Sequence, residues 1–299
     1  MVTLDGKIAL GPVSLNTYDA FPALLTVAAV AALVTRRGLL ALTLLGAAAA
    51  MKLYAVLLVP AAVIWLWREL GRRAALQALG AFAATAAVLV VPWIALSPGG
   101  VWDSLDSQVG RGLHTESLGA GFLLVADRLG WYHAHVVATA PAVSRDLAGS
   151  LPHAVAAGSA VLAVAAALVP AVILLWRRRG PGIVFAATVA GFLAFTKVLS
   201  PQYVVWLIPL VPFGGPAAML LLIAALALAQ SWYFHYHDLW AVGPQAWTLL
   251  ARNLVLVALY ASLLWKTSTP SSSKTSRQSG LWRSLTSAAA DGSGATRSA

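Results

Sequence analysis

Cysteine is absent from the 299 residues, and charged residues make up only 10% of them. The first absence excludes disulfides, thiol catalysis and cysteine–metal sites. The second falls far below the roughly 25% of charged residues in soluble domains, and 60% of the residues are hydrophobic. We therefore interpret the chain as an integral membrane protein. It also lacks the phosphate-binding P-loop, the dinucleotide-binding glycine fingerprint and the H-E-x-x-H zinc motif.

The few charges that remain are mostly basic. Lys and Arg number 20 against 10 Asp and Glu, which gives a formal net charge of +10. Such an excess can indicate nucleic-acid binding. In a polytopic membrane protein it follows from the positive-inside bias and from contact with anionic headgroups. We therefore expect membrane lipids as partners and no nucleic acid.

Apolar runs predict an all-α, polytopic fold with about nine transmembrane helices. Several runs are shorter than the ~20 residues that cross a ~30 Å hydrocarbon core. Two stretches, 38–67 and 182–213, look like helix pairs broken by polar residues, and such breaks are where membrane proteins build sites. The nine runs are 21–35, 38–51, 54–67, 75–97, 153–176, 182–197, 203–213, 217–231 and 247–265.

Basic clusters predict the orientation, because Lys and Arg gather in cytoplasmic loops. Arg36–Arg37, Arg68–Arg73, Arg177–Arg179 and the segment from Lys266 fall on one side, which places the C-terminus in the cytoplasm. The outer side of the plasma membrane receives all six histidines and eight of the ten acids. The groups able to do acid–base chemistry therefore concentrate on the outer face.

Three regions follow from this topology. Residues 1–20 form an outer-face segment, and 21–265 form the transmembrane domain with an outer loop at 98–152. Residues 266–299, rich in Ser, Thr, Ala and Gly, are expected to be a disordered cytoplasmic tail. An outer N-terminus without an exporting signal sequence leads us to expect that 1–20 end a truncated loop, with an odd number of spans missing upstream.

Four polar clusters meet on the outer side or at its membrane boundary. Two follow the predicted helix breaks, one opens the outer loop, and the fourth lies among aromatic residues. They are Lys52 with Tyr54; Lys197 with Gln202 and Tyr203; Arg111 with His114 and Glu116; and His235 with His237 and Asp238.

The third cluster leads into an amphipathic run. Leu118, Phe122, Leu123 and Val125 would share its apolar side. This pattern predicts an interfacial helix on the outer leaflet, with the polar group at its start.

Each cluster also has a simpler interpretation. Lys52 could snorkel to lipid headgroups, and Arg111 with Glu116 could be a local ion pair or cap. Ser200–Pro201 could only break a helix, although that leaves Lys197 unexplained. Arg252, near the outer end of the last span, could meet a phosphate or only a headgroup.

A metal site is not expected. His235 and His237 would share a face only on a strand, and no second set of ligands is evident.

Together, Lys52, Arg111, Lys197 and Arg252 could surround an outer-leaflet cavity beside carboxylates and histidines. Fixed cations stabilise a phosphate as it leaves, and a carboxylate or histidine can deprotonate an incoming hydroxyl. Nucleotide donors are cytosolic, so an outer-face transferase would need a lipid-linked donor.

Three stretches carry a family resemblance: "KLYAVLLVP" (52–60), "RGLHTESL" (111–118) and "KVLSPQYVVWLIPL" (197–210). They resemble the polyprenyl-phosphate-mannose-dependent α-mannosyltransferases of the GT-C fold, prominent in actinobacterial envelope biosynthesis, and "YDAFPALL" (18–25) fits the same family. The resemblance covers roughly residues 15–265. It implies an inverting hexosyltransferase that moves mannose from an isoprenoid phosphate to a glycan or glycolipid hydroxyl on the outer face, with no cofactor and no obligatory metal.

The resemblance also suggests roles for residues. Lys197, Gln202 and Tyr203 would face the donor phosphate with Arg111 and Lys52 nearby, and Arg252 is a further candidate. Glu116 would orient Arg111 or bind a sugar hydroxyl, and His235, His237 or Asp238 would contact the sugar or acceptor; these four are weaker candidates for the catalytic base.

In this fold the base is usually an aspartate in the first outer loop. That loop would lie upstream of Met1, and neither Asp5 nor Asp19 is assigned as the base. Two alternatives stay open: a non-catalytic relative that binds polyprenyl lipid, and a lipid or solute transporter.

Overall fold

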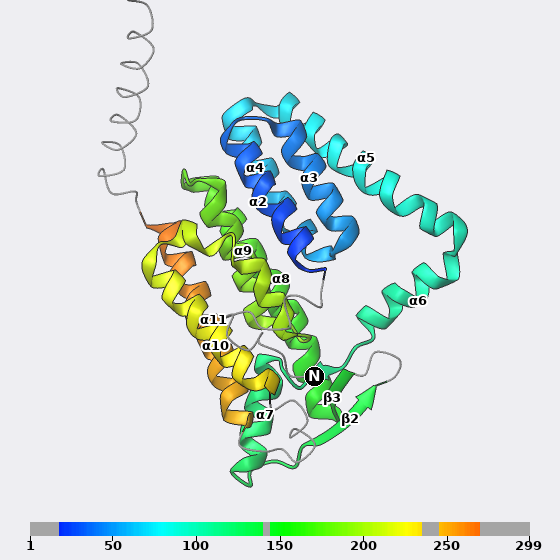
Figure 1. Cartoon of the computed structure of the whole chain (residues 1–299), viewed down its shortest axis with the longest axis vertical. Helices are drawn as coiled ribbons and strands as arrows, with labels where there is room; N and C mark the ends of the chain where they lie inside the picture. Colours follow the sequence, from blue (N-terminus) through cyan, green and yellow to red (C-terminus); the bar gives the residue numbers. More distant parts are fainter. Residues whose placement is uncertain (1–17, 140–143, 235–244, 270–299) are drawn as a thin grey trace, which may run out of the picture. The chain divides into compact units, whose positions relative to one another are not determined.

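The computed structural model describes residues 18–139, 144–234 and 245–269. Residues up to Thr267 belong to one compact unit, and the residues from Ser268 onward form a second. Helices dominate the first unit (Figure 1). The prediction of an all-α membrane protein fits this structure. The described residues do not confirm a count of nine spans.

Eight apolar helical segments lie close to predicted spans. Four of them are long and apolar enough to cross a membrane: Leu53–Leu70, α5, α8 and α11. The others, α2, α3, α9 and α10, are shorter. The bounds are α2 (Ala20–Val34), α3 (Gly38–Met51), the 3-10 turn η2 (Leu53–Leu58) leading into α4 (Val59–Leu70), α5 (Arg72–Leu96), α8 (Ser150–Trp176), α9 (Pro181–Phe195), α10 (Pro216–Phe234) and α11 (Gln245–Ser268).

The predicted helix at 203–213 is wrong. The segment forms two short 3-10 turns, η3 (Pro201–Leu207) and η4 (Val211–Gly214). Pro201, Pro209 and Pro212 each lack the N–H that an α-helix needs. The turns are nevertheless largely buried, with Val204, Trp206 and Leu207 in the core.

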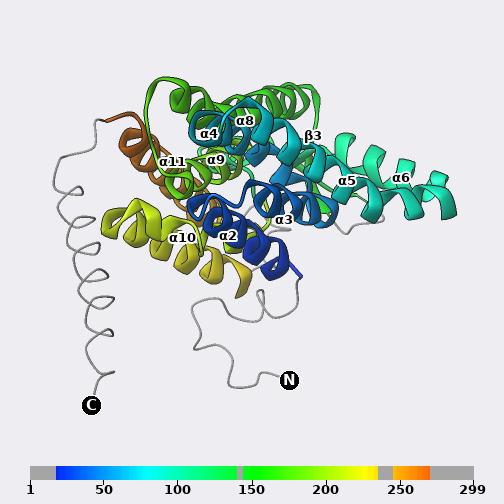
Figure 2. The ribbon, with the colours of Figure 1, turned by 90° about the horizontal axis from the view of Figure 1, so that it is seen from above.

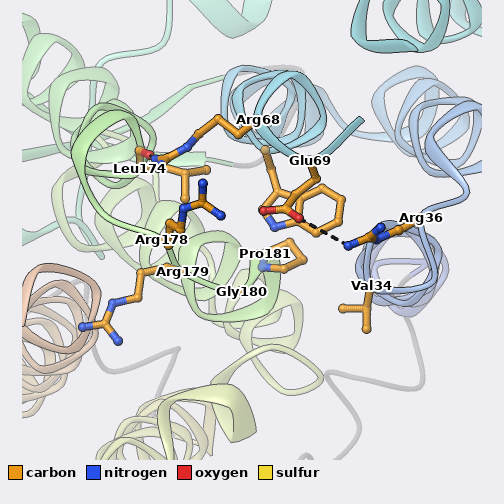
Figure 3. A pocket seen from close by; sticks show the side chains of 10 residues that line it. Val34, Arg36, Arg68, Glu69, Leu174, Arg178, Arg179, Gly180 and Pro181 are labelled. Carbon is orange, nitrogen blue, oxygen red and sulfur yellow. Dashed lines mark hydrogen bonds and ion pairs between the residues drawn. The ribbon is translucent and has the colours of Figure 1, made fainter. Parts of the chain in front are cut away.

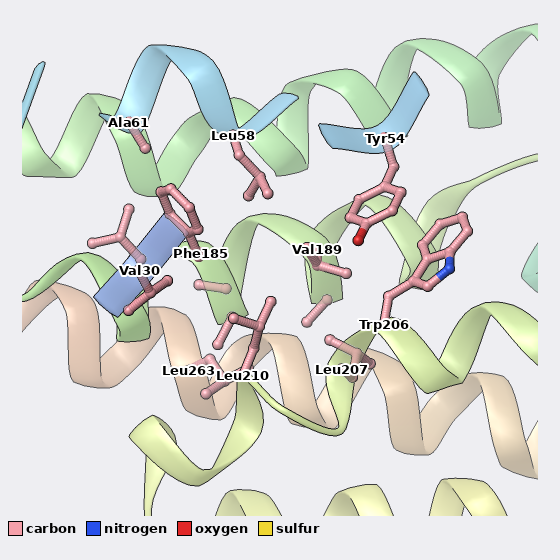
Figure 4. Close-up of a cluster of buried hydrophobic side chains, with 14 of the residues drawn as sticks. Val30, Tyr54, Leu58, Ala61, Phe185, Val189, Trp206, Leu207, Leu210 and Leu263 are labelled. Carbon is pink, nitrogen blue, oxygen red and sulfur yellow. The ribbon is translucent and has the colours of Figure 1, made fainter. Parts of the chain in front are cut away.

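The helices pack through small side chains. α3 lies against α2 and α5, while α8 lies against α9 and α4, as the two ribbon views show (Figures 1 and 2). Gly191 of α9 lies so close to α8 that an added Cβ would come 2.8 Å from the Ala166 carbonyl oxygen. Close backbone approach of this kind is how membrane helices gain packing energy. The core includes Phe185, Leu210 and the Tyr54–Trp206 pair (Figure 4).

The loop 98–152, which was predicted to lie on the outer face, contains regular structure. It holds α6 (Pro98–Val109), β1 (Leu113–His114), α7 (Leu118–Arg128), β2 (His135–Thr139) and β3 (Ser144–Ala148). β3 is the central strand of an antiparallel sheet of order β1-β3-β2. No strands are predicted here from the sequence, because β1 and β3 are too short and too polar to show an alternating pattern.

α7 corresponds to the predicted amphipathic helix. Ser117 caps it by accepting a hydrogen bond from the Ala120 N–H at 3.3 Å. Its buried face comprises Ala120, Gly121, Leu124 and Val125. Phe122, predicted on the apolar side of an interfacial helix, is 52% exposed in the protein alone; a side chain that faces lipid would also be exposed, so that part stays a prediction.

Candidate functional site

A cavity of about 570 Å³ opens between α3, α8, α9, η3 and α6. Lys52, Lys197 and Tyr203 line it together, although they come from two different helix breaks. The wall formed by the membrane helices is apolar and includes Ala49, Val164 and Phe192. The cavity thus combines two cations at its polar part with a hydrocarbon-like wall, and its volume is typical of small-molecule sites. We call it the lysine cavity.

Lys52 stands where α3 ends and η2 begins, in extended backbone (φ −150°, ψ 121°). The side chain is 18% exposed, and its Nζ lies 3.4 Å from the Oδ1 of Asp19. Three rings approach the same ammonium, with centroids at 4.8 Å for Tyr18, 5.1 Å for Tyr203 and 5.9 Å for Trp206. The ion pair and the ring faces hold the cation without using all three of its donors.

Three aromatic rings stack behind Lys52. The ring of Trp206 lies between those of Tyr54 and Tyr203, with centroid separations of 4.0 Å and 4.6 Å. Figure 4 shows Tyr54 beside Trp206 at the edge of the core. A stacked set of this size has little freedom to move, so it fixes the wall against which Lys52 lies.

Asp19, for which the sequence predicts no role, is buried beside Lys52. Its side chain is 1% exposed, and its Oδ1 accepts a hydrogen bond of 2.8 Å from the Trp206 indole N–H. Its Oδ2 has no hydrogen-bond partner. An acid in the stretch "YDAFP" at the start of an apolar run was a signal that it needs a buried cation, but nothing local identified Lys52 as that cation.

Lys197 lies two residues past the end of α9 and is hydrogen-bonded to the loop 98–152. Its Nζ donates to the Arg111 carbonyl oxygen at 2.7 Å, and its own carbonyl accepts from the His114 N–H at 3.0 Å. Burial, followed by the nearby Arg111 charge, lowers the pKa of Lys197. The loop therefore holds this lysine in place beside the cavity.

Glu116 and Arg252 form a separate, closed group. The Arg252 Nη1 donates to the Glu116 Oε2 at 2.9 Å, and its Nε donates to the Asn253 Oδ1 at 3.2 Å. Asn253 in turn donates to the Glu116 carbonyl at 3.0 Å. The side chains of Arg252 and Glu116 are 0% and 3% exposed. This group ties the start of α7 to α11.

Arg252 was predicted as a phosphate ligand, and Glu116 as a partner of Arg111 or of a sugar hydroxyl; both roles stay predictions, and the structure shows the two side chains paired with each other. Neither residue lines the lysine cavity, because each is committed to the other. Sequence spacing could not reveal a pair that is separated by 136 residues.

Two further predicted residues lie beside the cavity instead of lining it. Arg111 accepts the Lys197 hydrogen bond through its backbone, and Gln202 follows Pro201 on η3. Both are partly buried. His235, His237 and Asp238 fall outside the described residues.

His114 is a buried titratable group next to this region. Burial is the largest influence on its pKa and lowers it; the Arg111 charge adds to the lowering, while Glu116 and Asp146 oppose it. Its Nδ1 has no hydrogen-bond partner. The described ranges contain no group of three His, Asp or Glu residues placed to hold a metal ion.

Comparison with known protein families gives one match. Residues 147–268 match the family model described as Mannosyltransferase (PIG-M). This segment runs from β3 to α11 and contains Lys197, Tyr203 and Trp206. The match supports a mannosyltransferase. No curated protein and no solved structure matches the chain.

Proposed function

We propose that the chain is an inverting glycosyltransferase of the plasma membrane. It moves mannose from a polyprenyl-phosphate donor to a hydroxyl of a glycan or glycolipid on the outer face. The observation that carries this proposal is the lysine cavity, in which Lys52 and Lys197 face an apolar wall. The match of 147–268 to a mannosyltransferase family supports the nature of the transferred sugar.

The donor has three parts that the cavity can recognise. The phosphate carries the charge that Lys52 and Lys197 attract, and such charge-assisted hydrogen bonds are the strong ones. The isoprenoid chain suits the apolar side chains of α3, α8 and α9. Tyr18 and Tyr203, which line the same space, carry hydroxyls that can hydrogen-bond the sugar.

The reaction requires one displacement at the anomeric carbon. The acceptor oxygen forms a bond to that carbon while the bond to the donor phosphate oxygen breaks, and the phosphate leaves with the electron pair. Attack from the side opposite the phosphate inverts the anomeric configuration. Negative charge grows on the phosphate in the transition state, so Lys52 and Lys197 would stabilise the transition state more than the ground state.

The surroundings of Lys52 give it a fixed position. Asp19 is a positioning residue in this scheme, since its carboxylate is buried against Trp206 and pairs with the lysine. Preorganised charges of this kind need little rearrangement during the reaction. Because Asp19 does not line the cavity, we do not assign it to proton transfer.

The acceptor proton needs a base, and the described residues that line the cavity include no Asp or Glu. Glu116 is held by Arg252, which leaves His235, His237 and Asp238 as candidates beyond the described ranges. The same observation favours a second function, in which the chain binds polyprenyl phosphate without transferring its sugar.

Two measurements on the same membranes separate these functions. The first is transfer of radiolabelled mannose from polyprenyl-phosphate-mannose, and the second is binding of polyprenyl phosphate to the purified chain. We expect Lys197→Ala to abolish transfer and to weaken binding, whereas Lys197→Arg retains part of both. Arg128→Ala removes an exposed outer-side charge at the end of α7 and is the matched control.

Each result has a defined meaning. Transfer that depends on Lys197 supports the enzyme, and binding that depends on Lys197 without any transfer supports the lipid-binding function. Equal binding by the parent, Lys197→Ala and Arg128→Ala chains would contradict both.

A further inference from the structure

A second cavity, of about 390 Å³, lies where α2 and α4 end and α9 begins. The lysine cavity lies where α3 and α9 end, so the two cavities are at opposite ends of α9. Four arginines and one glutamate line the second cavity, a formal charge of +3. We call it the arginine cavity; its charged residues are Arg36, Arg68, Arg178, Arg179 and Glu69 (Figure 3).

Two of the arginines build the walls. Arg68 donates from Nη1 to the carbonyl oxygens of Leu174 and Arg177, the latter at 3.2 Å, and so joins α4 to the end of α8. Arg179 donates from Nε to the Thr267 carbonyl at 3.1 Å. A guanidinium has five N–H donors, so both retain donors after making these bonds.

The other two arginines are exposed at the mouth. Arg36 and Arg178 lie on opposite sides of Glu69 in Figure 3. The Arg36 Nη2 is 3.7 Å from the Glu69 Oε2, and the arginine side chain is 67% exposed. Exposed pairs at this distance are weak. Glu69 therefore leaves most of the positive charge of the cavity uncompensated.

The backbone of Arg36 supplies an independent observation. Its φ is 59°, and it is the single non-glycine residue with positive φ among the described residues. It occupies the position after α2 where the Arg36 N–H meets the Leu33 carbonyl and the Arg37 N–H meets the Ala32 carbonyl. Glycine is the usual residue there because it adopts this conformation without strain. An arginine at a strained backbone position indicates a use for its side chain.

We propose that the arginine cavity binds the phosphate of an anionic membrane lipid. Trp65, Val34 and Leu174 line it beside the arginines, so a ligand must present apolar surface next to its charge. A lipid headgroup with its glycerol and first methylenes has that character, and basic pockets between membrane helices bind such headgroups. The basic clusters place this end on the cytoplasmic leaflet. The proposal does not depend on mannosyl transfer.

The test uses the full chain in lipid nanodiscs. Native mass spectrometry counts the phosphatidylglycerol retained after exchange from mixed phosphatidylglycerol–phosphatidylcholine discs. We expect the double variant Arg36→Gly/Arg178→Gln to retain about tenfold less phosphatidylglycerol, since charge-assisted bonds to phosphate are lost. Arg36→Gly also relieves the backbone strain, so this variant should fold at least as well as the parent.

A gain of binding provides the second arm. Glu69→Gln removes the carboxylate from the cavity, and we expect retention to rise severalfold. Unfolding cannot produce that result. Arg73→Gln is the matched control, because Arg73 is exposed near the same end but does not line the cavity.

Three results would overturn the proposal. The first is an Arg73→Gln chain that loses as much phosphatidylglycerol as the double variant does. The second is a parent chain that retains phosphatidylglycerol and phosphatidylcholine equally. The third is a thermal midpoint that inorganic phosphate raises, in discs of phosphatidylcholine alone, by as much as phosphatidylglycerol does. The last result would instead identify a soluble phosphate as the ligand.

Discussion

Two of the cation–carboxylate pairs in the described part of the chain, Arg252–Glu116 and Lys52–Asp19, lie at different parts of the fold and are built differently. Arg252 and Glu116 meet at 2.9 Å, and both are almost fully buried. Lys52 and Asp19 meet at 3.4 Å, and the lysine is 18% exposed beside a cavity. In the sequence, each of the four charged residues stands near an apolar run and far from its partner. Sequence alone therefore does not distinguish the two pairs.

The difference lies in what each cation has left to offer. Arg252 donates to Glu116 and to Asn253 and lines no part of the lysine cavity. Lys52 is held by one carboxylate oxygen and by ring faces, and it lines that cavity. A fully satisfied pair specifies how two segments join, whereas a partly satisfied cation on a cavity can receive an anion.

The largest effect on stability is expected from breaking the Arg252–Glu116 pair. Glu116→Gln leaves the Arg252 charge buried without its counter-ion, and losses of this kind cost about 3 to 5 kcal/mol. We expect a large fall in the thermal midpoint of the detergent-solubilised chain, followed by intrinsic tryptophan fluorescence. Arg252→Met/Glu116→Leu removes both charges and should recover much of the loss while polyprenyl-phosphate affinity stays near that of the parent. An unchanged midpoint in Glu116→Gln would show that the pair does not join α7 to α11.

Neutralising the Lys52–Asp19 pair should affect ligand affinity and leave thermal stability nearly unchanged. Lys52→Met/Asp19→Asn leaves no buried charge, and the Asn oxygen can still accept from Trp206. We therefore expect a thermal midpoint close to that of the parent. Affinity for polyprenyl phosphate should fall about 10- to 100-fold, since a hydrogen bond to a charged group contributes about 1.5 to 3 kcal/mol. Titration calorimetry with polyprenyl phosphate measures this loss, and unchanged affinity would remove Lys52 from the donor site.

The pH dependence of Lys197 sharpens the comparison further, because arginine stays charged and lysine does not. The pKa of Lys197 is lower in the fold than the ordinary value of 10.5. Between the two pKa values the unfolded chain binds more protons, so the contribution of Lys197 to stability rises with pH. Its attraction for phosphate falls over the same window, by about 10- to 100-fold if one hydrogen bond to a charged group is lost.

Lys197→Arg serves as the control for this titration. Its affinity should stay flat as the pH rises toward 10.5, while that of the parent declines. Parallel curves for the two chains would show that Lys197 does not contact the phosphate.

Much of the helical fold could be predicted from the positions of apolar runs and basic residues along the chain. The predicted spans 21–35 and 38–51 differ from α2 and α3 by at most one residue at either end, because long apolar runs bounded by arginine leave few alternatives. The predicted helix at 203–213 was wrong, since hydrophobicity indicates burial but not whether proline permits a helix.

The candidate site was predictable where it depends on helix breaks. Lys52, Lys197 and Tyr203 do share one cavity, and a charge at a break in an apolar pair was the signal. Asp19 and Arg252 could not be placed, because their partners lie 33 and 136 residues away in the chain. Only the fold decides which distant carboxylate meets which cation.

The smallest effect is expected behind the Lys52–Asp19 pair, where the Tyr54 ring stacks on Trp206. The Thr26 hydroxyl donates its proton to the Pro22 carbonyl at 2.7 Å, so in the 2.9 Å contact between the two hydroxyls Tyr54 must be the donor. Tyr54→Phe removes that donor but keeps the ring stack, and we expect a loss of about 0.5 to 1.5 kcal/mol in stability. Thr26→Val should cost more, because it leaves the buried Tyr54 hydroxyl without its acceptor. Thermal midpoints of the two variants test this order.

Affinity for polyprenyl phosphate should change less than twofold in Tyr54→Phe, since Lys52 keeps its carboxylate and its ring faces. A larger change would mean that the Tyr54 hydroxyl, and not the ring stack, sets the position of the Lys52 ammonium.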